Sequence, residues 1–542
     1  MLNLTPNLLS GMHHTLLLIL SLLFVVFMLV MLGQRLKISY PIFLVLAGLG
    51  IGFIPGLPHI EIDTDMIFLI FLPPLLYEAA WYTSWNDFWK WKRPIMMLAF
   101  GAVIFTSCIV AYTSKSMIPG FTLALGFLLG GIISPPDSVA ATSVLKHLKV
   151  PKRVLTVLEG ESLINDASSL IVFRFAMVAV ITGQFVMQKA IGDFFLSAGM
   201  GIVIGLAVAH IMYYIHRWLP TTASIDSALT VMTPYFMYLA AEQFHYSGVL
   251  AVVSGGLFLS YRSHAIFPNG ATRMQMLGVW STLIFVLNGI IFILIGLELP
   301  TIIHSLGDYS IADAIRYGVI IAFLTILVRL LWVYPGAFIP RMLSKKIRER
   351  EPNPGWKGPL IVGWAGMRGV VSLASALSVP LLFPHRNLIL FITFIVILVT
   401  LVFQGLTLPL LIRIIKIGEI DVITPADQQE AGIQLTLMKV ALNILEEKYA
   451  FEATDNELIG SLKKNLENNI QNTGARLESL ECSETEKAEV DLYHAVLRDI
   501  YALQRKELFQ LRRHNVFSDE VIRSQEMQLD LDEMKIMRPG HE

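Results

Sequence analysis

The chain is poor in charged residues and in cysteine, and both shortages narrow its class. Only 15% of its 542 residues are charged, whereas soluble globular proteins have about 25%. The two cysteines, Cys108 and Cys482, fall in an apolar segment and in a polar tail, so we expect neither a disulfide framework nor a cysteine metal site. The sequence has no phosphate-binding loop. We therefore expect no ATP-driven step, no bound cofactor and no nucleic-acid partner.

Apolar residues make up 55% of the chain, and the mean hydropathy is +0.63. They occur in runs of about 20 residues, the length that crosses a bilayer as a helix. The first run, near Thr15 to Leu32, lacks a basic front and a small-residue cleavage site, which favours a retained span over a signal peptide. We predict an all-α polytopic membrane protein with about thirteen transmembrane helices. The predicted spans are 12–32, 38–57, 65–83, 93–114, 119–146, 153–182, 191–216, 225–243, 247–262, 278–300, 311–340, 358–382 and 387–416.

Positive charge alternates between the predicted loops. Lys90, Lys92 and Arg93 lie in the third loop, and the eleventh holds a longer basic run from Arg341 to Lys357. Because basic loops stay in the cytoplasm, this pattern predicts an outside N-terminus and a cytoplasmic C-terminal tail. The expected location is the cell membrane.

The composition changes near residue 418. Residues 418–542 mix charges with helical apolar spacing, which predicts a cytosolic domain of about four amphipathic helices. This domain either regulates the protein, stabilises a dimer, or is a solvated helical appendage, and no ligand motif decides between these. The transmembrane domain is predicted to span residues 1–417.

Several ionisable residues lie far from the ends of the predicted spans. A charged side chain at mid-bilayer costs at least ~3 kcal/mol, so such residues are usually functional. They are Glu78, Asp137, Glu161, Asp166, Arg174, Arg329 and Arg368.

Two predicted spans carry helix-breaking residues. Pro135-Pro136 removes two amide donors from the fifth span, and Gly363, Gly366 and Gly369 punctuate the twelfth. A broken helix at membrane depth is tolerated where it lines a cavity or is buried in protein. Spans four to six and spans eleven to thirteen would each form a group of three helices with a broken middle helix. The two groups would run in opposite directions, as in an inverted repeat whose broken helices cross. For the glycines, close helix packing is an alternative.

The stretch GESLINDASS concentrates polar groups in the sixth span. On a helix, Ser162 and Asp166 share one face, and Glu161 and Asn165 share the next. Two carboxylates this close cannot both ionise cheaply unless one has a counter-charge, and we expect Arg368 to pair with Glu161. Asp166 would then bind either a proton or a small hard cation, but not readily both. The alternative is a purely structural polar network.

Four motifs, FLPPLLYEAA, SPPDSVAAT, GESLINDASSL and GWAGMRGVVSLASAL, together resemble the sodium/proton exchangers of the monovalent cation:proton antiporter-1 class. The chain is similar to the bacterial type with a cytosolic helical tail. The resemblance implies a homodimer in which core spans 93–182 and 311–416 move against dimerisation spans 12–83 and 225–300.

The same resemblance implies roles for individual residues. It implies that Asp166, Ser162 and Glu78 bind the monovalent cation, that Asp137 holds the site together through water or Asn165, and that Glu161 and Arg368 form a structural ion pair. The family usually has threonine where this chain has Pro136, whose carbonyl can still coordinate. Loss of that hydroxyl affects the choice between Na⁺, K⁺ and Li⁺. The Asn165-Asp166 pair implies electroneutral exchange, because relatives with two adjacent aspartates tend to be electrogenic.

The expected function is secondary-active exchange of a monovalent cation for a proton, serving pH and cation homeostasis, and not an enzymatic reaction. A carrier or symporter of an organic ion is the main alternative, but it predicts a net basic site. An intramembrane aspartyl hydrolase using Asp137 and Asp166, or a channel or receptor, is a weaker reading of the same residues.

Overall fold

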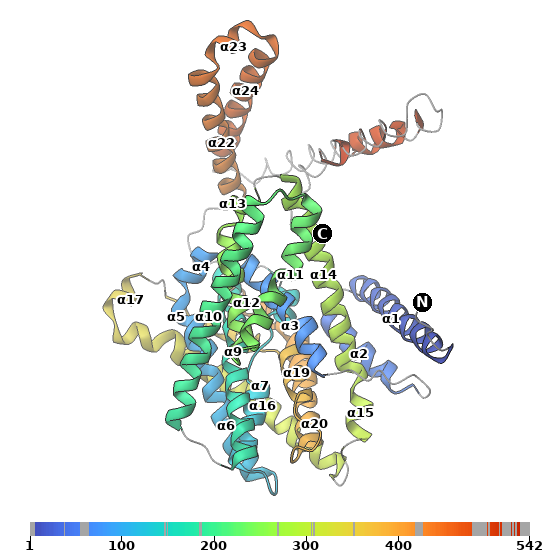
Figure 1. Ribbon diagram of the computed structural model, residues 1–542. Coiled ribbons are helices and arrows are strands. Elements are labelled where there is room, and N and C mark those ends of the chain that lie inside the picture. The colour runs from blue at the N-terminus through green and yellow to red at the C-terminus, as the bar shows by residue number, and fades with distance from the viewer. Residues whose placement is uncertain are drawn as a thin grey trace. The chain divides into compact units, whose positions relative to one another are not determined.

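The computed structural model describes residues 6–531 with gaps, of which the largest are 55–63, 418–425, 480–495 and 512–521. Every regular element in the described part of the chain is a helix (Figure 1). The chain divides into two compact units, Met1–Asp421 and Val422–Glu542. The apolar runs of the sequence lie in the first unit.

The first unit is a bundle of helices connected by short loops. Its longer elements are α1 (Pro6–Arg35), α2 (Tyr40–Gly52), α3 (Thr64–Tyr82), α6 (Val103–Met117), α7 (Leu123–Ile133), α8 (Ser138–Leu145), α9 (Lys152–Thr182), α10 (Met187–Trp218), α11 (Ala223–Glu242), α12 (Gly248–Tyr261), α14 (Gly270–Leu297), α16 (Ile311–Leu343), α18 (Lys357–Trp364), α19 (Val370–Leu377), α20 (Arg386–Val399) and α21 (Gly405–Ile415). Short helices are α4 (Trp85–Lys90), α5 (Lys92–Met96), α13 (Ser263–Ile266), α15 (Leu299–His304) and α17 (Lys345–Arg350).

In the described residues, eight helical segments are long and apolar enough to cross a membrane. The predicted spans outside these eight fall on α2, α3, α11, α12 and the pair α18–α19, which are also helical. The all-helical, multi-span architecture is therefore confirmed, and the count of thirteen stays a prediction. Residues 55–57, at the end of the predicted 38–57 span, lie outside the described residues.

Both helices that carry the breaking residues are interrupted. One helix stops at Ile133 and resumes at Ser138, and the other stops at Trp364 and resumes at Val370. The amide of Asp137 donates a hydrogen bond to the carbonyl of Met367 at 2.7 Å, so the two unwound segments are joined directly. Crossing of the two helices as an inverted repeat stays a prediction.

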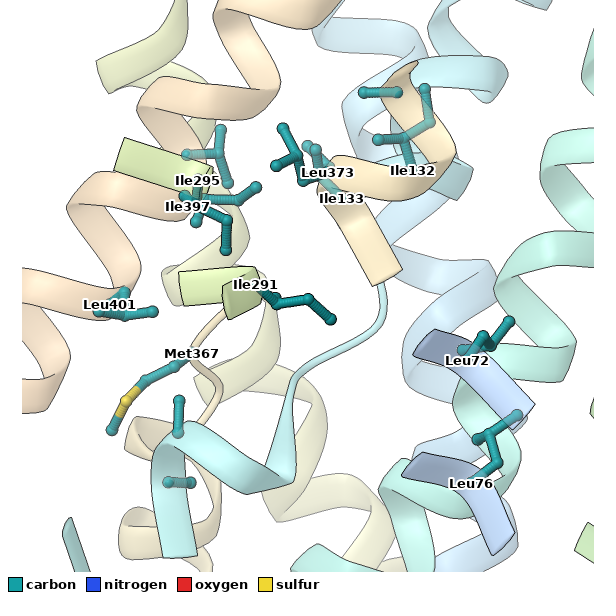
Figure 2. Close-up of a cluster of buried hydrophobic side chains, with 14 of the residues drawn as sticks. Leu72, Leu76, Ile132, Ile133, Ile291, Ile295, Met367, Leu373, Ile397 and Leu401 are labelled. Atoms are coloured by element: carbon teal, nitrogen blue, oxygen red, sulfur yellow. The ribbon is translucent and has the colours of Figure 1, made fainter. Parts of the chain in front are cut away.

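An apolar cluster surrounds the interruptions. In Figure 2, Ile133 from the end of α7 lies near Leu373 of α19, and Ile291 of α14 belongs to the same cluster. These side chains are at most 7% exposed. Close packing of these buried side chains holds the broken helix ends in place.

Two π-helical segments form hydrogen bonds with α9 and with the second interruption. They are η1 (Met97–Ala102), between α5 and α6, and η2 (Thr400–Gln404), between α20 and α21. The hydroxyl of Ser168 donates to the carbonyl of Ala99 at 2.5 Å, and the amide of Arg368 donates to Thr400 Oγ1 at 3.1 Å. Segments of this kind free backbone and side-chain groups for contacts between helices, and they occur frequently at functional sites.

The second unit contains a helical hairpin. It consists of α22 (Ala426–Lys448), the short α23 (Ala450–Asp455) and α24 (Glu457–Ser479), with α22 and α24 side by side (Figure 1). Lys463 of α24 lies 3.0 Å from Glu446 of α22. Residues 495–513 of the predicted tail domain are described only in part.

Candidate functional site

The GESLINDASS stretch lies in the middle of α9. This helix follows Pro151, which cannot donate to a preceding turn, and ends at Gly183, whose φ of +69° places it in the left-handed region. Within the helix, Glu161 and Asn165 are fully buried, and Asp166 is only 7% exposed. The sequence thus places an amide and two acids in the interior of the bundle.

Asp166 opens into a cavity at the interruption of the first broken helix. About 60 Å³ of this cavity is open to molecules the size of water, which is room for several of them. Its walls include Pro136, Asp137, Ser162 and Asp166, all predicted site residues. Among the described residues, no group hydrogen-bonds the Asp166 carboxyl. A buried carboxylate without donors is costly, so this carboxyl requires a proton or a cation.

Asp137 lies at the start of α8 and beside the start of α19. Its Oδ1 accepts a hydrogen bond from the amide of Val139 at 2.8 Å. Its Oδ2 is buried and has no hydrogen-bond partner in the described part of the chain. Helix N-termini attract negative charge, which accounts for a carboxylate at this depth. The free oxygen leaves capacity to bind a cation or water.

Two glycines of the second broken helix allow close approaches that no larger residue permits. A Cβ atom on Gly369 would lie 1.8 Å from Asp137 Oδ2, and one on Gly366 would lie 2.2 Å from the Cδ of Arg329. Gly366 and Gly369 therefore lie in the interrupted segment and also allow close packing against Arg329 and Asp137. The two readings of the sequence do not exclude each other.

Asn165 and Ser162 connect α9 to the first interruption. The side-chain amide of Asn165 donates to the carbonyl of Pro136 at 3.2 Å. The hydroxyl of Ser162 lies 3.4 Å from the amide of Ser138. These contacts bring Asn165, Pro136 and Ser162 together beside Asp166.

One predicted contact is corrected by the structure. The ion-pair partner of Glu161 is Arg329 of α16 and not Arg368. Nη1 and Nη2 of Arg329 donate to the two carboxylate oxygens of Glu161 at 2.6 and 2.9 Å. Arg329 also donates to the carbonyl of Val362 at 3.2 Å. Both charged side chains are at most 2% exposed. A planar guanidinium fits a carboxylate at two points, which makes this a strong, oriented pair.

Arg368 is buried nearby but differently bonded. Its side chain is 1% exposed, and its Nε and Nη1 have no hydrogen-bond partner among the described residues. It lies within electrostatic reach of Glu161 and Arg329. It also follows the C-terminal end of α18, where a helix favours positive charge. Arg368 therefore contributes charge to this region without a direct carboxylate contact.

Glu78, the ligand expected from the third predicted span, is not among the residues that line the cavity. It is half-buried on α3, where its neighbours Leu75, Leu76 and Ala79 line the cavity but Glu78 does not. It lies within electrostatic reach of Tyr40. The sequence also left Arg174 without a role, and this residue pairs with Glu242 of α11 at 2.7 Å.

Sequence reasoning missed two polar residues of the cavity wall, Asn288 of α14 and Ser372 of α19. Neither carries a charge, so a census of ionisable groups passes over them. An amide at the centre of the apolar run FVLNGIIFIL is the signal that could have identified Asn288.

Chemically, the cavity combines two carboxyl groups with hydroxyl, amide and carbonyl oxygens. Hard monovalent cations prefer oxygen ligands of this kind. The same Asp166 oxygens can take up a proton, and proton and cation compete for one negative charge. The arrangement can therefore exchange one for the other.

Comparisons with known proteins agree with this chemistry. The profile of the family described as sodium/hydrogen exchanger, transmembrane, matches residues 19–414. A Bacillus pumilus protein named a sodium, potassium, lithium and rubidium/H⁺ antiporter is 34% identical to this chain. The match covers 68% of this chain and 57% of the length of that relative. A Mycobacterium bovis protein named an uncharacterized Na⁺/H⁺ exchanger is 30% identical over 98% of both chains.

The fold has a solved counterpart. The structure of the sodium proton antiporter MjNhaP1 from Methanocaldococcus jannaschii superimposes with a TM-score of 0.56 at 20% identity, covering 72% of this chain and 96% of that one. At this identity the likeness concerns the fold. With the family profile covering most of the membrane unit, the chain belongs to the sodium/hydrogen exchanger family, a family of multi-pass secondary transporters rather than enzymes.

Proposed function

We propose that this protein is a secondary antiporter that exchanges a monovalent cation for a proton at Asp166. The observation that carries the proposal is a buried Asp166 carboxyl, without a hydrogen-bond donor among the described residues, facing a cavity at a helix interruption. Such a carboxyl needs one positive charge at a time. Membership of the sodium/hydrogen exchanger family supports the same activity.

Na⁺ is the first cation to consider, with K⁺ and Li⁺ as further candidates. The Bacillus pumilus relative is named for exchange of sodium, potassium, lithium and rubidium. In this chain Pro136 supplies only a backbone carbonyl where the family pattern has a hydroxyl. A site with fewer fixed hydroxyl ligands discriminates less by geometry, which favours a broad cation range.

In the proposed cycle, Asp166 releases its proton as the cation binds, and the loaded site then opens to the other side of the membrane. The other proposed ligands are Ser162, the Pro136 carbonyl and Glu78, with Asp137 and Asn165 holding the interruption. Glu161 and Arg329 keep α9 and α16 in register throughout, since both oxygens of Glu161 accept hydrogen bonds from the Arg329 guanidinium. A carrier of organic ions is disfavoured, because the acids of the cavity create a cation site.

We further propose electroneutral exchange, one cation for one proton. Asn165 is uncharged, and its side-chain amide donates a hydrogen bond to the carbonyl of Pro136. Asp166 is therefore the titrating group of the Asn-Asp pair. Equal sodium-driven exchange at several imposed membrane potentials is the expected result, and strong voltage dependence would contradict it.

The proposed setting is a homodimer in the cell membrane with the N-terminus outside and the residues after 417 in the cytoplasm, where basic loops face. Exchange of this kind serves pH and cation homeostasis. The unit Val422–Glu542 is proposed to regulate the transporter or stabilise the dimer.

The test is proton movement in inverted membrane vesicles that are acidified by respiration. Addition of Na⁺, K⁺ or Li⁺ between pH 6 and 9 is expected to dissipate the acid interior with wild type and not with Asp166→Asn. No response of wild type to any of the cations would overturn the proposed function. A response of both proteins would move the proton site away from Asp166.

A further inference from the structure

The cavity has more unsatisfied polar atoms than the predicted site accounts for. Among the described residues, buried side-chain atoms without a hydrogen-bond partner include Asp137 Oδ2, Asn288 Oδ1 and Ser372 Oγ, and all three residues line the cavity. Leaving one such atom unsatisfied costs about 1–3 kcal/mol. Three around one cavity indicate a ligand that satisfies them together.

Asn288 is held in place by its own helix and by α2. Phe285 and Phe292, which flank it at helical spacing on α14, have ring centroids 6.3 and 6.4 Å from that of Tyr40. The Tyr40 side chain also interacts with Asn288. Asn288 itself is 3% exposed. Tyr40, which packs against both phenylalanine rings, therefore holds the Asn288 side chain at the cavity wall.

Ser372 lies in the first turn of α19 and is 1% exposed. Buried serines in helices commonly bond back to their own helix, as Ser375 does by donating to the carbonyl of Val371 at 2.7 Å. Ser372 makes no such bond. Ser372 therefore brings a hydroxyl without a hydrogen-bond partner, among the described residues, to the wall of the cavity.

We propose that Asn288 and Ser372 are further cation ligands and set the affinity and selectivity of the site, an inference that rests on the proposed cation site at Asp166. They lie on α14 and α19, whereas Asp166 and Ser162 lie on α9, so the cation is coordinated from separate helices. Helix α19 packs against α14, α3 and α9, which brings these walls together.

The charge of the cavity explains why neutral ligands fit here. Asp137 and Asp166 already bring two carboxyl groups to one small volume. A third acid would require an additional proton or cation for neutrality. An amide and a hydroxyl oxygen replace water around the cation without adding charge, and one proton still suffices to displace it.

The experiment measures exchange by the full-length protein in proteoliposomes at pH 8.5, with Na⁺, Li⁺ and K⁺ as probes. Asn288→Ala and Ser372→Ala are expected to raise the half-saturating Na⁺ concentration about tenfold or more, as for loss of one ligand to a charge. The Li⁺ response is expected to fall less than the Na⁺ response, because a smaller ion needs fewer ligands. Asn288→Gln, which keeps a neutral amide oxygen, is expected to lose less Na⁺ affinity than Asn288→Ala.

Ser107→Ala and Thr393→Val are matched controls, because each removes a buried, unpartnered hydroxyl of α6 or α20 that does not line the cavity. They are expected to behave as wild type. Wild-type affinity and cation ranking in folded Asn288→Ala and Ser372→Ala would overturn the inference while leaving the proposed function standing. If Asn288→Ala fails to fold, wild-type affinity and cation ranking in folded Ser372→Ala would still overturn the inference. Absence of exchange by wild type would instead contradict the proposed function.

Discussion

Two acids little more than one turn apart on α9 have opposite environments. Both oxygens of Glu161 accept hydrogen bonds from Arg329, and the pair excludes water. Asp166 faces a cavity and has no donor among the described residues. In a low-dielectric interior, a carboxylate whose oxygens are both hydrogen-bonded to a cation can stay charged, whereas a carboxylate without donors is costly unless a proton or a cation neutralises it. We call the Glu161–Arg329 ion pair the anchor and the Asp166 carboxyl the binding group.

The largest expected effect comes from breaking the anchor. Glu161→Ala or Arg329→Ala leaves a buried charge unpaired and is expected to cost about 3–5 kcal/mol of stability. The measurement is thermal unfolding of the purified protein together with its yield in membranes. The double variant Glu161→Gln/Arg329→Met removes both charges at similar volume and is expected to recover most of the loss. A single variant as stable as wild type would contradict the anchor role.

Gly369→Ala is expected to impair cation exchange more than it lowers the stability of the fold. A Cβ atom 1.8 Å from Asp137 Oδ2 forces the carboxylate to move. We expect loss of exchange with a smaller loss of stability, about 1–3 kcal/mol, as for overpacking of a buried site. Cation-dependent proton movement and unfolding temperature measured on the same preparation separate the two effects. Normal exchange by this variant would show that the contact is dispensable.

Comparison of two buried arginines sharpens the distinction. Arg329 is hydrogen-bonded to Glu161, whereas Nε and Nη1 of Arg368 have no partner in the described part of the chain. We therefore expect Arg368→Met to lower the unfolding temperature less than Arg329→Met does. Differential scanning fluorimetry in detergent makes the comparison. An equal or larger loss for Arg368→Met would place the structural counter-charge at Arg368 after all.

The smallest effect is expected at a solvated pair, Asp87 of α4 with Lys152, whose side-chain atoms lie 2.9 Å apart. Partial burial opposes ionisation, but the hydrogen bond from Lys152 holds the pKa of Asp87 below its usual value. A lowered pKa stabilises the fold above the unfolded value of about 3.9 and loses that contribution as pH falls through the folded value. Because Lys152 is exposed, Asp87→Asn is expected to cost less than about 1 kcal/mol at pH 7. The difference in unfolding temperature from wild type should shrink below pH 4, and an increase would contradict the sign.

Much of this arrangement is readable from the sequence because local chemistry determines it. Pro135-Pro136 cannot continue a helix, and the helix is interrupted there. Asn165 donates a hydrogen bond to the carbonyl of Pro136, and Asp166 lines the same cavity as Pro136. In each case the residues involved are neighbours on one helix or on the next one along the chain.

The contacts that the sequence did not predict depend on packing between distant segments. Two arginines, Arg329 and Arg368, are available to Glu161, and only the relative position of α16, α9 and the second interruption selects Arg329. Asn288 reaches the cavity because α14 packs against α3 and α19. Helical periodicity within one span carries no information about such neighbours.

The most direct test of the account measures proton release when Na⁺ is added to the purified protein in weakly buffered detergent solution. The account predicts that wild type and the double variant Glu161→Gln/Arg329→Met release protons as Na⁺ binds, whereas Asp166→Asn releases none. Proton release by Asp166→Asn equal to that of wild type would contradict the claim that cation and proton compete for this carboxyl.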